Sequence, residues 1–436
     1  MEKSVAVLGG GVMGLTTAYL LSKHGFKVTV FEKEKELGGQ LASVKVNGQL
    51  VDRFYHYLFQ DDLQVFPLLE DLGVNPVDEL TFEPIKQGLY KDNHLYSFNG
   101  LFDLFDLNTS IKSKLGYLKT LAKIKYLPLC AKHYDRRTAF DFLTRKISPE
   151  QYNYFWKFLL EKKYGDIYQD ISLLHVFTRV KKALVNKSLT TNLEFGYFTY
   201  GCDRLVNLLC SALIKNNGNI LKDCEVISLK QLKQSCYDKF IVQTKDNQLL
   251  FDGVVSTLPL EVLSSIVKPL KLTDYAKIAS IKSMGCVCVA AAYKFPVTNN
   301  FWNNLDLPGC ISPGLIEYSN LKPMSFSLCY MPFYLTKDSN LWRFNDDFFI
   351  EQLNTLVKRL SPQNSLLDFK ISRYSYAQPY FTYDVSRKIP SIDTGIKSFY
   401  LADTTFAYPQ DRSMDRSIYL AHKLADKLTK DLSDKI

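Results

Sequence analysis

The chain opens with a strand, a glycine-rich turn, a helix and a second strand that ends in an acidic residue. Residues 5–14 read VAVLGGGVMG, an apolar helical segment follows, and residues 27–32 read KVTVFE. In such a unit one glycine permits the tight turn, a second lets the backbone approach a pyrophosphate, and a third lets helix and strand pack closely. Gly9, Gly11 and Gly14 stand at these positions. The pattern predicts an α/β unit that binds a dinucleotide.

The helix of this unit is predicted over about residues 12–24, and Gly25 has the character of a C-cap. We expect the diphosphate to lie on the first amides of the helix, at Val12 and Met13, where the helix dipole is positive. Glu32 is placed to accept hydrogen bonds from a ribose 2′-hydroxyl. A phosphate at that position would be repelled, so a 2′-phosphorylated cofactor is disfavoured.

A glycine pair follows Glu32 in the run Lys33-Glu34-Lys35-Glu36-Leu37-Gly38-Gly39-Gln40. This extension resembles the flavoprotein superfamily that includes amine oxidases, protoporphyrinogen oxidases, phytoene desaturases and UDP-galactopyranose mutases. In that superfamily the pair wraps back over FAD, so the resemblance implies FAD as cofactor and contacts from Lys33, Gly39 and Gln40. The superfamily usually has arginine after the pair. With Gln40 there, we expect a weaker contact with the FAD phosphates, or one made by backbone alone.

The far end of the chain supports the same resemblance. Residues 398–403 are predicted to form a short buried strand, and residues 413–430 a closing helix. By resemblance, Asp403 holds the ribityl chain and the amide of Met414 faces the flavin pyrimidine carbonyl. Helix-start amides suit the negative charge that develops there when flavin is reduced. The resemblance further places the backbone near Val226 beside the adenine and Thr257 beneath the cofactor.

The predicted fold class is α/β, with a Rossmann-like FAD-binding domain interleaved with a substrate domain made of a helical part and a mixed β-sheet. Apolar spacing predicts mostly helices with few strands over about residues 63–192, and strands with aromatics over residues 280–383, interrupted by a helix over 346–360. The predicted segments are 1–62, 193–275 and 385–436 for the FAD-binding domain, 63–192 for the helical part and 276–384 for the sheet.

The chemistry is expected beside the flavin ring, in the run Val51-Asp52-Arg53-Phe54-Tyr55-His56-Tyr57-Leu58-Phe59. UDP-galactopyranose mutases have a similar histidine-containing run at this distance from the glycine pair. We expect His56 to hold or release a proton near neutral pH or to hydrogen-bond the flavin. Arg53 is expected to stabilise an anionic reduced flavin or an anionic substrate group. Tyr55 and Tyr57 are expected to contact the substrate.

Amine oxidases of the superfamily carry a lysine near the flavin inside a Gly-x-x-x-Lys strand. Aligning on Gly285 places Val289 at that position, so Val289 is expected at the substrate site and simple amine oxidation is disfavoured. The tail Tyr408-Pro409-Gln410-Asp411-Arg412-Ser413-Met414-Asp415 resembles a motif of a bacterial branch of protoporphyrinogen oxidase-like proteins.

Composition and charge limit the kinds of partner and compartment that we expect. The formal charge of +9 favours an anionic partner, and nothing in the sequence indicates a nucleic acid or a metal site. No run of 18 apolar residues occurs, the first strand begins too early for a signal peptide, and the nine cysteines show no paired framework. We therefore expect a cytoplasmic protein. The stretch 112–137 is basic among apolar residues, which fits a peripheral contact with a membrane surface, an anionic ligand, or a solvated helix packed on its own domain.

These observations predict an FAD-dependent oxidoreductase that moves a hydride from a small-molecule substrate, sugar-derived or amine-bearing, to flavin N5. No second G-x-G-x-x-G motif occurs, so dioxygen, a quinone or a partner protein is the expected electron acceptor. The alternative is a mutase-like enzyme whose reduced flavin attacks a nucleotide sugar. A third class is an idle flavoprotein scaffold, which would bind FAD without substrate-induced bleaching. The sequence leaves substrate, acceptor and oligomeric state open.

Overall fold

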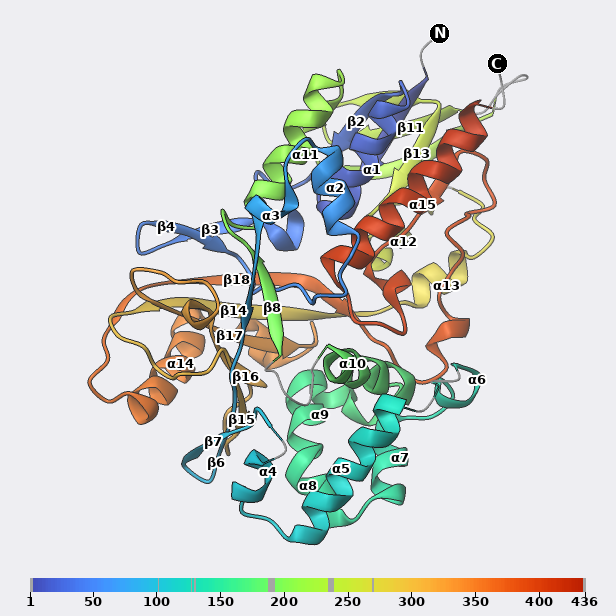
Figure 1. Cartoon of the computed structure of the whole chain (residues 1–436). Coiled ribbons are helices and arrows are strands. Elements are labelled where there is room, and N and C mark those ends of the chain that lie inside the picture. Colours follow the sequence, from blue (N-terminus) through green and yellow to red (C-terminus); the bar gives the residue numbers. More distant parts are fainter. Residues whose placement is uncertain are drawn as a thin grey trace.

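The computed structural model describes residues 3–100, 102–126, 128, 131–186, 193–233, 239–268 and 270–433. Figure 1 shows three regions: a Rossmann-like layer at the top that carries both ends of the chain, a large sheet across the middle, and a lobe of helices below. Segments from both ends of the sequence meet in the upper layer, which confirms the predicted interleaved α/β class.

The upper layer is built on a five-stranded sheet in which every neighbouring pair is parallel. Its strand order is β19 (Phe399–Leu401), β13 (Gly253–Ser256), β1 (Ser4–Leu8), β2 (Lys27–Phe31) and β9 (Asn219–Leu221). Alternation along β1 divides its side chains between two cores, because successive residues of a strand face opposite sides. Val5 and Val7 pack with helices, whereas Ala6 and Leu8 pack against a second, smaller sheet.

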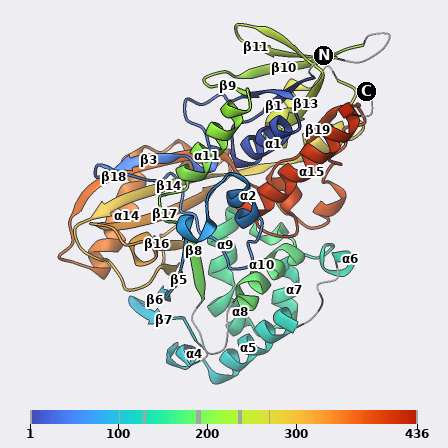
Figure 2. The ribbon, with the colours of Figure 1, turned by 45° about the horizontal axis from the view of Figure 1, so that its top comes forward.

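The helical side of this sheet is covered by α1 (Val12–Lys23), α11 (Asp203–Lys215) and α15 (Met414–Ser433), with α2 (Val65–Asp71) beside them. The other side carries β10 (Val226–Leu232), β11 (Lys239–Thr244), β12 (Gln248–Phe251), α12 (Leu260–Ile266) and α13 (Tyr275–Ser280). Figure 2 shows β10 and β11 projecting above the parallel strands. The predicted helix over residues 12–24 is confirmed, and Gly25 follows it with φ +80°.

The middle sheet is mixed, as predicted. Its order is β18 (Leu366–Pro379), β14 (Ser283–Tyr293), β17 (Ser327–Leu335), β16 (Gly314–Glu317), β15 (Trp302–Asp306), β6 (Gln87–Lys91) and β7 (His94–Ser97). The β15–β6 pair is parallel and the others are antiparallel. α14 (Asp346–Leu360) packs on one face. It has the predicted bounds, and the Asn345 side chain caps it by accepting from the Phe348 amide.

The lower lobe contains α4 (Asp103–Asp106), α5 (Ile111–Tyr126), α6 (Ala131–Tyr134), α7 (Ala139–Lys146), α8 (Pro149–Phe155), α9 (Lys157–Tyr164) and α10 (Leu173–Val185). Three of these helices begin at a side-chain cap: Thr138 for α7, Ser148 for α8 and Ser172 for α10. Such caps satisfy amides that have no partner within the helix.

Two short ribbons join these regions: β3 (Ser43–Val46) with β4 (Gln49–Asp52), and β5 (Leu80–Pro84) with β8 (Glu194–Phe198); α3 (Pro76–Glu79) precedes β5. The strands β5, β6 and β7 correct the expectation that residues 63–192 form few strands. β6 forms a hairpin with β7 across Asp92 and Asn93, which both have positive φ, and it extends the middle sheet by pairing with β15, far along the chain. The segment boundaries themselves stay predictions, and residue 192 lies outside the described residues.

The basic stretch 112–137 is not one helix. α5 ends at Tyr126 and α6 begins at Ala131, with Pro128 between them. A proline within a helix removes one amide donor and clashes with the preceding turn, which explains the break. Lys114 is buried and donates to the Phe105 carbonyl at 2.8 Å, so it does not belong to the exposed basic face. Residues 127, 129 and 130 and the side chain of Lys132 lie outside the described residues.

Candidate active site

The glycine turn after β1 forms an open cradle. Gly9 has φ +105°, a conformation that side chains other than glycine rarely adopt. A methyl group at Gly14 would lie 1.9 Å from the Gly9 carbonyl oxygen, whereas one at Gly11 would have no neighbour within 4 Å. Thr257 lies beneath the turn and donates to the Leu8 carbonyl at 3.0 Å. Gly11 thus faces free space at the start of α1, as backbone that receives a diphosphate must.

The acidic residue and the glycine pair are tied to this turn. Glu32 Oε2 accepts from the Gly10 amide at 2.7 Å, and its Oε1 accepts from the Glu34 amide at 2.9 Å. The Gly38 amide donates to the Gly10 carbonyl at 2.8 Å, and both glycines of the pair have positive φ. The pair therefore folds back over the turn. Each carboxylate oxygen has two lone pairs, so Glu32 keeps acceptor capacity for a ribose.

A single cavity of about 670 Å³ begins at this cradle and continues into the lower part of the molecule. Sixteen of the predicted site residues line it: Gly9, Gly11, Val12, Met13, Glu32, Lys33, Gly39, Gln40, Arg53, Tyr55, His56, Tyr57, Val226, Thr257, Asp403 and Met414. Gly14 supports the turn from behind. An open glycine turn, a helix N-terminus and a long cavity at one site fit an extended dinucleotide such as FAD.

The C-terminal segment also lines the cavity, and Asp403 follows β19 at the same edge of the parallel sheet as the glycine turn. Asp403 is buried; its carboxylate accepts from the Leu260 amide at 2.9 Å and from the Thr405 amide at 2.8 Å. Burial raises the pKa of Asp403, and these amide donors oppose the rise. α15 begins at Met414, one residue after the predicted start, and Met414 lines the cavity. The Ser413 hydroxyl accepts from the Arg416 amide at 3.1 Å, and the amides before it have no partner inside the helix. The ribityl and pyrimidine contacts stay predictions.

The turn after β4 brings Arg53 and His56 into the cavity wall. The Arg53 Nε is buried without a hydrogen-bond partner, so it is available to a ligand. Burial, and then the charge of Arg412, lower the pKa of His56 to about 4. At neutral pH His56 is therefore an uncharged imidazole, which can orient a group by hydrogen bonding but carries no proton to give away as an acid.

Behind His56 lies a small polar group made with Asp52 and Cys202. The ligand atoms of the three side chains lie within 4.8 Å of one another, and Asp52 Oδ1 accepts from the Cys202 amide at 3.3 Å. Burial raises the pKa of Asp52 to about 6 and that of the Cys202 thiol well above its ordinary value. A cysteine must be a thiolate to bind a metal, so this environment favours a protonated Cys202 thiol beside Asp52 over a metal site.

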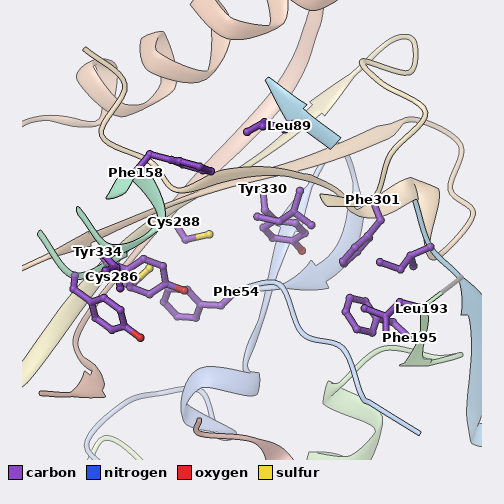
Figure 3. Close-up of a cluster of buried hydrophobic side chains, with 14 of the residues drawn as sticks. Phe54, Leu89, Phe158, Leu193, Phe195, Cys286, Cys288, Phe301, Tyr330 and Tyr334 are labelled. Atoms are coloured by element: carbon purple, nitrogen blue, oxygen red, sulfur yellow. The ribbon is translucent and has the colours of Figure 1, made fainter. Parts of the chain in front are cut away.

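Aromatic side chains form the wall beyond His56. The rings of Tyr57 and Phe195 are stacked with centroids 4.0 Å apart, and the Tyr55 and Tyr334 hydroxyls lie 3.0 Å apart. Figure 3 shows Tyr334 beside Cys286, and Phe195 beside Phe301, in the buried cluster that borders the cavity. Tyr55 and Tyr57 line the cavity, and their contact with a substrate stays a prediction.

The position of Val289 corrects the sequence-based expectation. On β14 the side chains of Cys286 and Cys288 belong to the cluster that borders the cavity, whereas Val289 packs on the opposite face with the residues of α14. Cys286, and not Val289, lines the cavity. Alternation along a strand makes this outcome unavoidable once Cys286 faces inward.

Five cavity cations were not predicted from the sequence: Lys163 on α9, Arg179 and Lys182 on α10, Arg373 on β18 and Arg412 just before α15. Of these, Lys182 pairs with Asp62 and Arg373 with Asp346. Arg179 Nη1 lies 3.1 Å and Arg412 Nη1 3.5 Å from the carboxylate of Asp411. Asp411 and Arg412 belong to the tail motif, which was the one sequence signal that could have predicted any of these cations. Lys163 and Arg179 lie on separate helices whose apolar spacing gives no hint of the cavity.

A dinucleotide-binding Rossmann sheet whose cradle continues into a cavity with an aromatic wall defines a class of protein: an enzyme that holds the reactive end of a bound dinucleotide against a small-molecule substrate. The chain belongs to the family described as flavin-containing amine oxidoreductase, whose profile matches residues 13–409. It is an FAD-dependent oxidoreductase.

Individual curated proteins match this chain either at low sequence identity or over short stretches only. Coproporphyrinogen III oxidase of Staphylococcus aureus is 24% identical over 326 residues, which cover 66% of this chain and 68% of that protein. Protoporphyrinogen oxidase 2 of Arabidopsis thaliana is 41% identical over 85 residues, 20% of this chain and 16% of that protein. The matched stretches span 16–24% of the length of the first three curated relatives, so they carry no substrate assignment.

Solved structures agree on the fold. Cyclohexylamine oxidase from Brevibacterium oxydans superposes with a TM-score of 0.79 over 99% of this chain and 100% of that chain, at 15% sequence identity. At this identity the likeness establishes the fold alone. Within the described part of the chain, no helix has both the length and the hydropathy needed to cross a bilayer.

Proposed function

We propose that the protein removes a hydride from a C–H bond of a small-molecule substrate held in the aromatic end of the cavity. The observation that carries this proposal is the continuity of one cavity from the glycine cradle to Arg53, His56 and the aromatic wall. FAD, when bound, supplies the two-electron acceptor.

The chain's own residues hold and shield the substrate in this proposal. The stacked rings of Tyr57 and Phe195 keep water from the reacting carbon, and Tyr55 and Tyr334 present hydroxyls to it. His56, which is neutral at pH 7, orients the substrate or the cofactor by hydrogen bonding. The Arg53 Nε, which has no partner, donates to an anionic group near the cofactor. Dioxygen, a quinone or a partner protein then takes up the electrons.

Anaerobic mixing tests the proposal. Nucleotide sugars, amines and porphyrinogens are mixed with the oxidised protein, and the flavin absorbance is followed. We expect one class to bleach the flavin, more slowly when the transferred hydrogen is deuterium, and His56→Ala to slow bleaching by up to ~10²-fold. A protein that binds FAD but is bleached by none of these classes would contradict the proposal.

A mutase-like reaction on a nucleotide sugar is the second candidate. The sequence shows no clear arginine pair for a diphosphate, yet the structure brings Arg179 and Arg412 to the same carboxylate in the cavity. Two guanidinium groups suit a diphosphate. The same experiment on dithionite-reduced protein separates the two reactions: turnover confined to the reduced form, with substrate and product of equal mass, would replace oxidation by isomerisation.

We also propose a peripheral contact between α5 and an anionic membrane surface. Phe102, Ile111, Leu115 and Tyr126 are among the most exposed large apolar side chains, with exposed fractions of 87%, 65%, 55% and 76%. The exposed lysines Lys112, Lys119 and Lys123 lie on the same helix, which contains no acidic residue. Apolar side chains enter the headgroup region while lysines attract anionic lipids, so this face fits such a surface.

A further inference from the structure

Lys163, Arg179 and Arg412 form a cluster around Asp411, called here the cationic cluster. The Lys163 side chain is 8% exposed, and its ammonium lies 3.8 Å from the centre of the Tyr334 ring. Arg412 also donates to Gln378 Oε1 at 2.9 Å. Arg179 Nη1 is buried and has no hydrogen-bond partner of good geometry, although Asp411 is near. Three elements thus aim cations at one end of the cavity.

The charges of this cluster do not balance. Arg179 and Arg412 stay protonated at any pH a protein meets, and Asp411 supplies one negative charge. Burial alone would raise the pKa of Asp411, but Arg179, Lys163 and Arg412 hold it well below its usual range, so it is ionised. One positive charge remains even before Lys163 is counted. Among the described residues, no carboxylate lies within ion-pair distance of Lys163.

The remaining titratable neighbours do not supply the missing negative charge. Burial lowers the pKa of His175 to about 4, so this imidazole is neutral. Burial also keeps the nearby phenols and the thiol protonated: Tyr55, Tyr57, Tyr164, Tyr334 and Cys286. The Arg179 and Arg412 side chains are 34% and 21% exposed, so their charge reaches the open space of the cavity, and the excess of positive charge there attracts an anion.

We propose that the cationic cluster is a binding subsite for an anionic group of the substrate, a carboxylate or a phosphate. The inference rests on the proposed function, because it names the substrate class of that same cavity. Arginine offers a planar fork of donors that matches either group, and lysine adds a compact charge. The apolar part of the substrate then lies along Tyr57 and Phe195.

The same charges select against a protonated amine. An ammonium group in this part of the cavity would meet two guanidinium groups and only one carboxylate, which already pairs with both. The subsite therefore favours a substrate with a carboxylate or phosphate group, such as an anionic sugar derivative, over a simple amine.

Lys163 couples anion binding to protonation. Burial, and then the charge of Arg179, hold the pKa of this ammonium well below its ordinary value. An anion beside it would raise the pKa again, so protonation and anion binding favour each other by thermodynamic linkage. Lys163 thus acts as the adjustable member of the cluster, whereas the arginines are fixed charges.

Benzoate and benzamide test the subsite without turnover, because they share a ring and differ in charge. FAD-loaded protein is titrated with each at constant ionic strength, and the perturbation of the flavin absorption is recorded. We expect benzoate to bind at least tenfold more tightly than benzamide. Lys163→Met and Arg179→Gln should each weaken benzoate at least tenfold and leave benzamide unchanged. Phenyl phosphate in a parallel titration shows which of the two anionic groups is preferred.

Lys157→Met is the matched control, since Lys157 lies on the same helix but is exposed and pairs with Glu161. It should bind benzoate as the parent protein does. FAD content and thermal unfolding are measured on every variant, so a loss of fold or of cofactor is distinguished from a loss of the subsite. Equal affinities for benzoate and benzamide would overturn the proposal. Variants that shift the flavin reduction potential while benzoate affinity stays unchanged would also overturn it, because the charges would then serve the reduced flavin.

Discussion

Gly11 and Gly14 lie three residues apart in one turn, yet each is glycine for a different physical reason. A methyl group at Gly14 would overlap the Gly9 carbonyl, so this position serves packing between helix and strand. A methyl group at Gly11 meets nothing in the protein, so this position serves the ligand. The sequence motif identifies both glycines, but only the structure separates their roles.

The two alanine variants should therefore fail differently. Gly14→Ala forces backbone apart and should destabilise the cofactor-free protein by roughly 1–3 kcal/mol or more. Gly11→Ala should change the stability of the cofactor-free protein by about 1 kcal/mol or less and still abolish tight FAD binding. Denaturant unfolding of the cofactor-free variants and FAD titration measure the two effects. Normal FAD binding by Gly11→Ala would contradict the assignment.

The raised pKa of Asp52 predicts the direction in which the unfolding free energy changes with pH. Burial raises its pKa to about 6, so between its ordinary value of 3.8 and 6 the folded protein binds more protons than the unfolded chain. The unfolding free energy therefore falls as pH rises through this window, by roughly 3 kcal/mol from this group. His56 acts in the opposite direction: with its pKa lowered to about 4, it removes stability as pH falls below 6.5.

Asp52→Asn keeps an oxygen acceptor for the Cys202 amide but cannot ionise. We compare the unfolding free energy of the variant with that of the parent protein. This difference should favour the variant more at pH 7.5 than at pH 4.5, by roughly 2–3 kcal/mol. Unfolding at both pH values measures this difference, with Asp78→Asn, a change at an exposed carboxylate, as control. Parallel pH profiles for Asp52→Asn and the parent protein would show that Asp52 titrates normally.

At the scale of elements, the local sequence pattern was sufficient to predict some helices and strands and insufficient for others. The helix over 346–360 has its own cap and amphipathic spacing, so its bounds follow from the sequence. β6 forms a local hairpin with β7, but its place in the middle sheet depends on β15, more than two hundred residues away, and local pattern did not predict that pairing. The cationic cluster escaped prediction for the same reason, because its three members come from separate elements. The prediction that Val289 lies at the substrate site was wrong, because the alignment on Gly285 did not consider that successive side chains of β14 face opposite sides of the sheet.

α5 carries the prediction that belongs to this scale. The protein should float with phosphatidylserine-containing vesicles and not with pure phosphatidylcholine vesicles. Reversing the three lysines, with Lys112→Glu, Lys119→Glu and Lys123→Glu together, should weaken binding at least a hundredfold, since each basic residue at such a surface contributes about 1 kcal/mol and reversal adds repulsion.

The matched control reverses three exposed cations on or beside α14, with Lys358→Glu, Arg359→Glu and Lys370→Glu. This triple variant has the same net charge, but Figure 1 shows α14 and α5 in different regions of the molecule. Equal loss of binding in both triple variants would mean that overall charge, and not the α5 face, attracts the vesicles.

For the whole molecule, the cavity is lined by segments of all three regions, from Leu8 near one end of the chain to Ser417 near the other. A ligand that fills it should therefore stabilise the entire fold. Saturating FAD at about a thousandfold above its Kd should add about 4 kcal/mol and raise Tm by several degrees. Differential scanning fluorimetry with FAD, and with NAD as control, measures this effect. An equal rise with NAD would contradict the cofactor preference.

The order of strands in the parallel sheet has a consequence for biosynthesis. β1 and β2 leave the ribosome first, but β13 and β19, which complete the sheet on the other side of β1, come from residues 253–256 and 399–401. At ordinary rates of translation, roughly 12–50 s separate the emergence of β1 and β13, and roughly 20–80 s separate that of β1 and β19. Until β13 emerges, β1 presents an unpaired edge that invites pairing with other nascent chains, and β13 presents one until β19 follows. The cradle can therefore hold FAD fully only after Asp403 and Met414 have been synthesised.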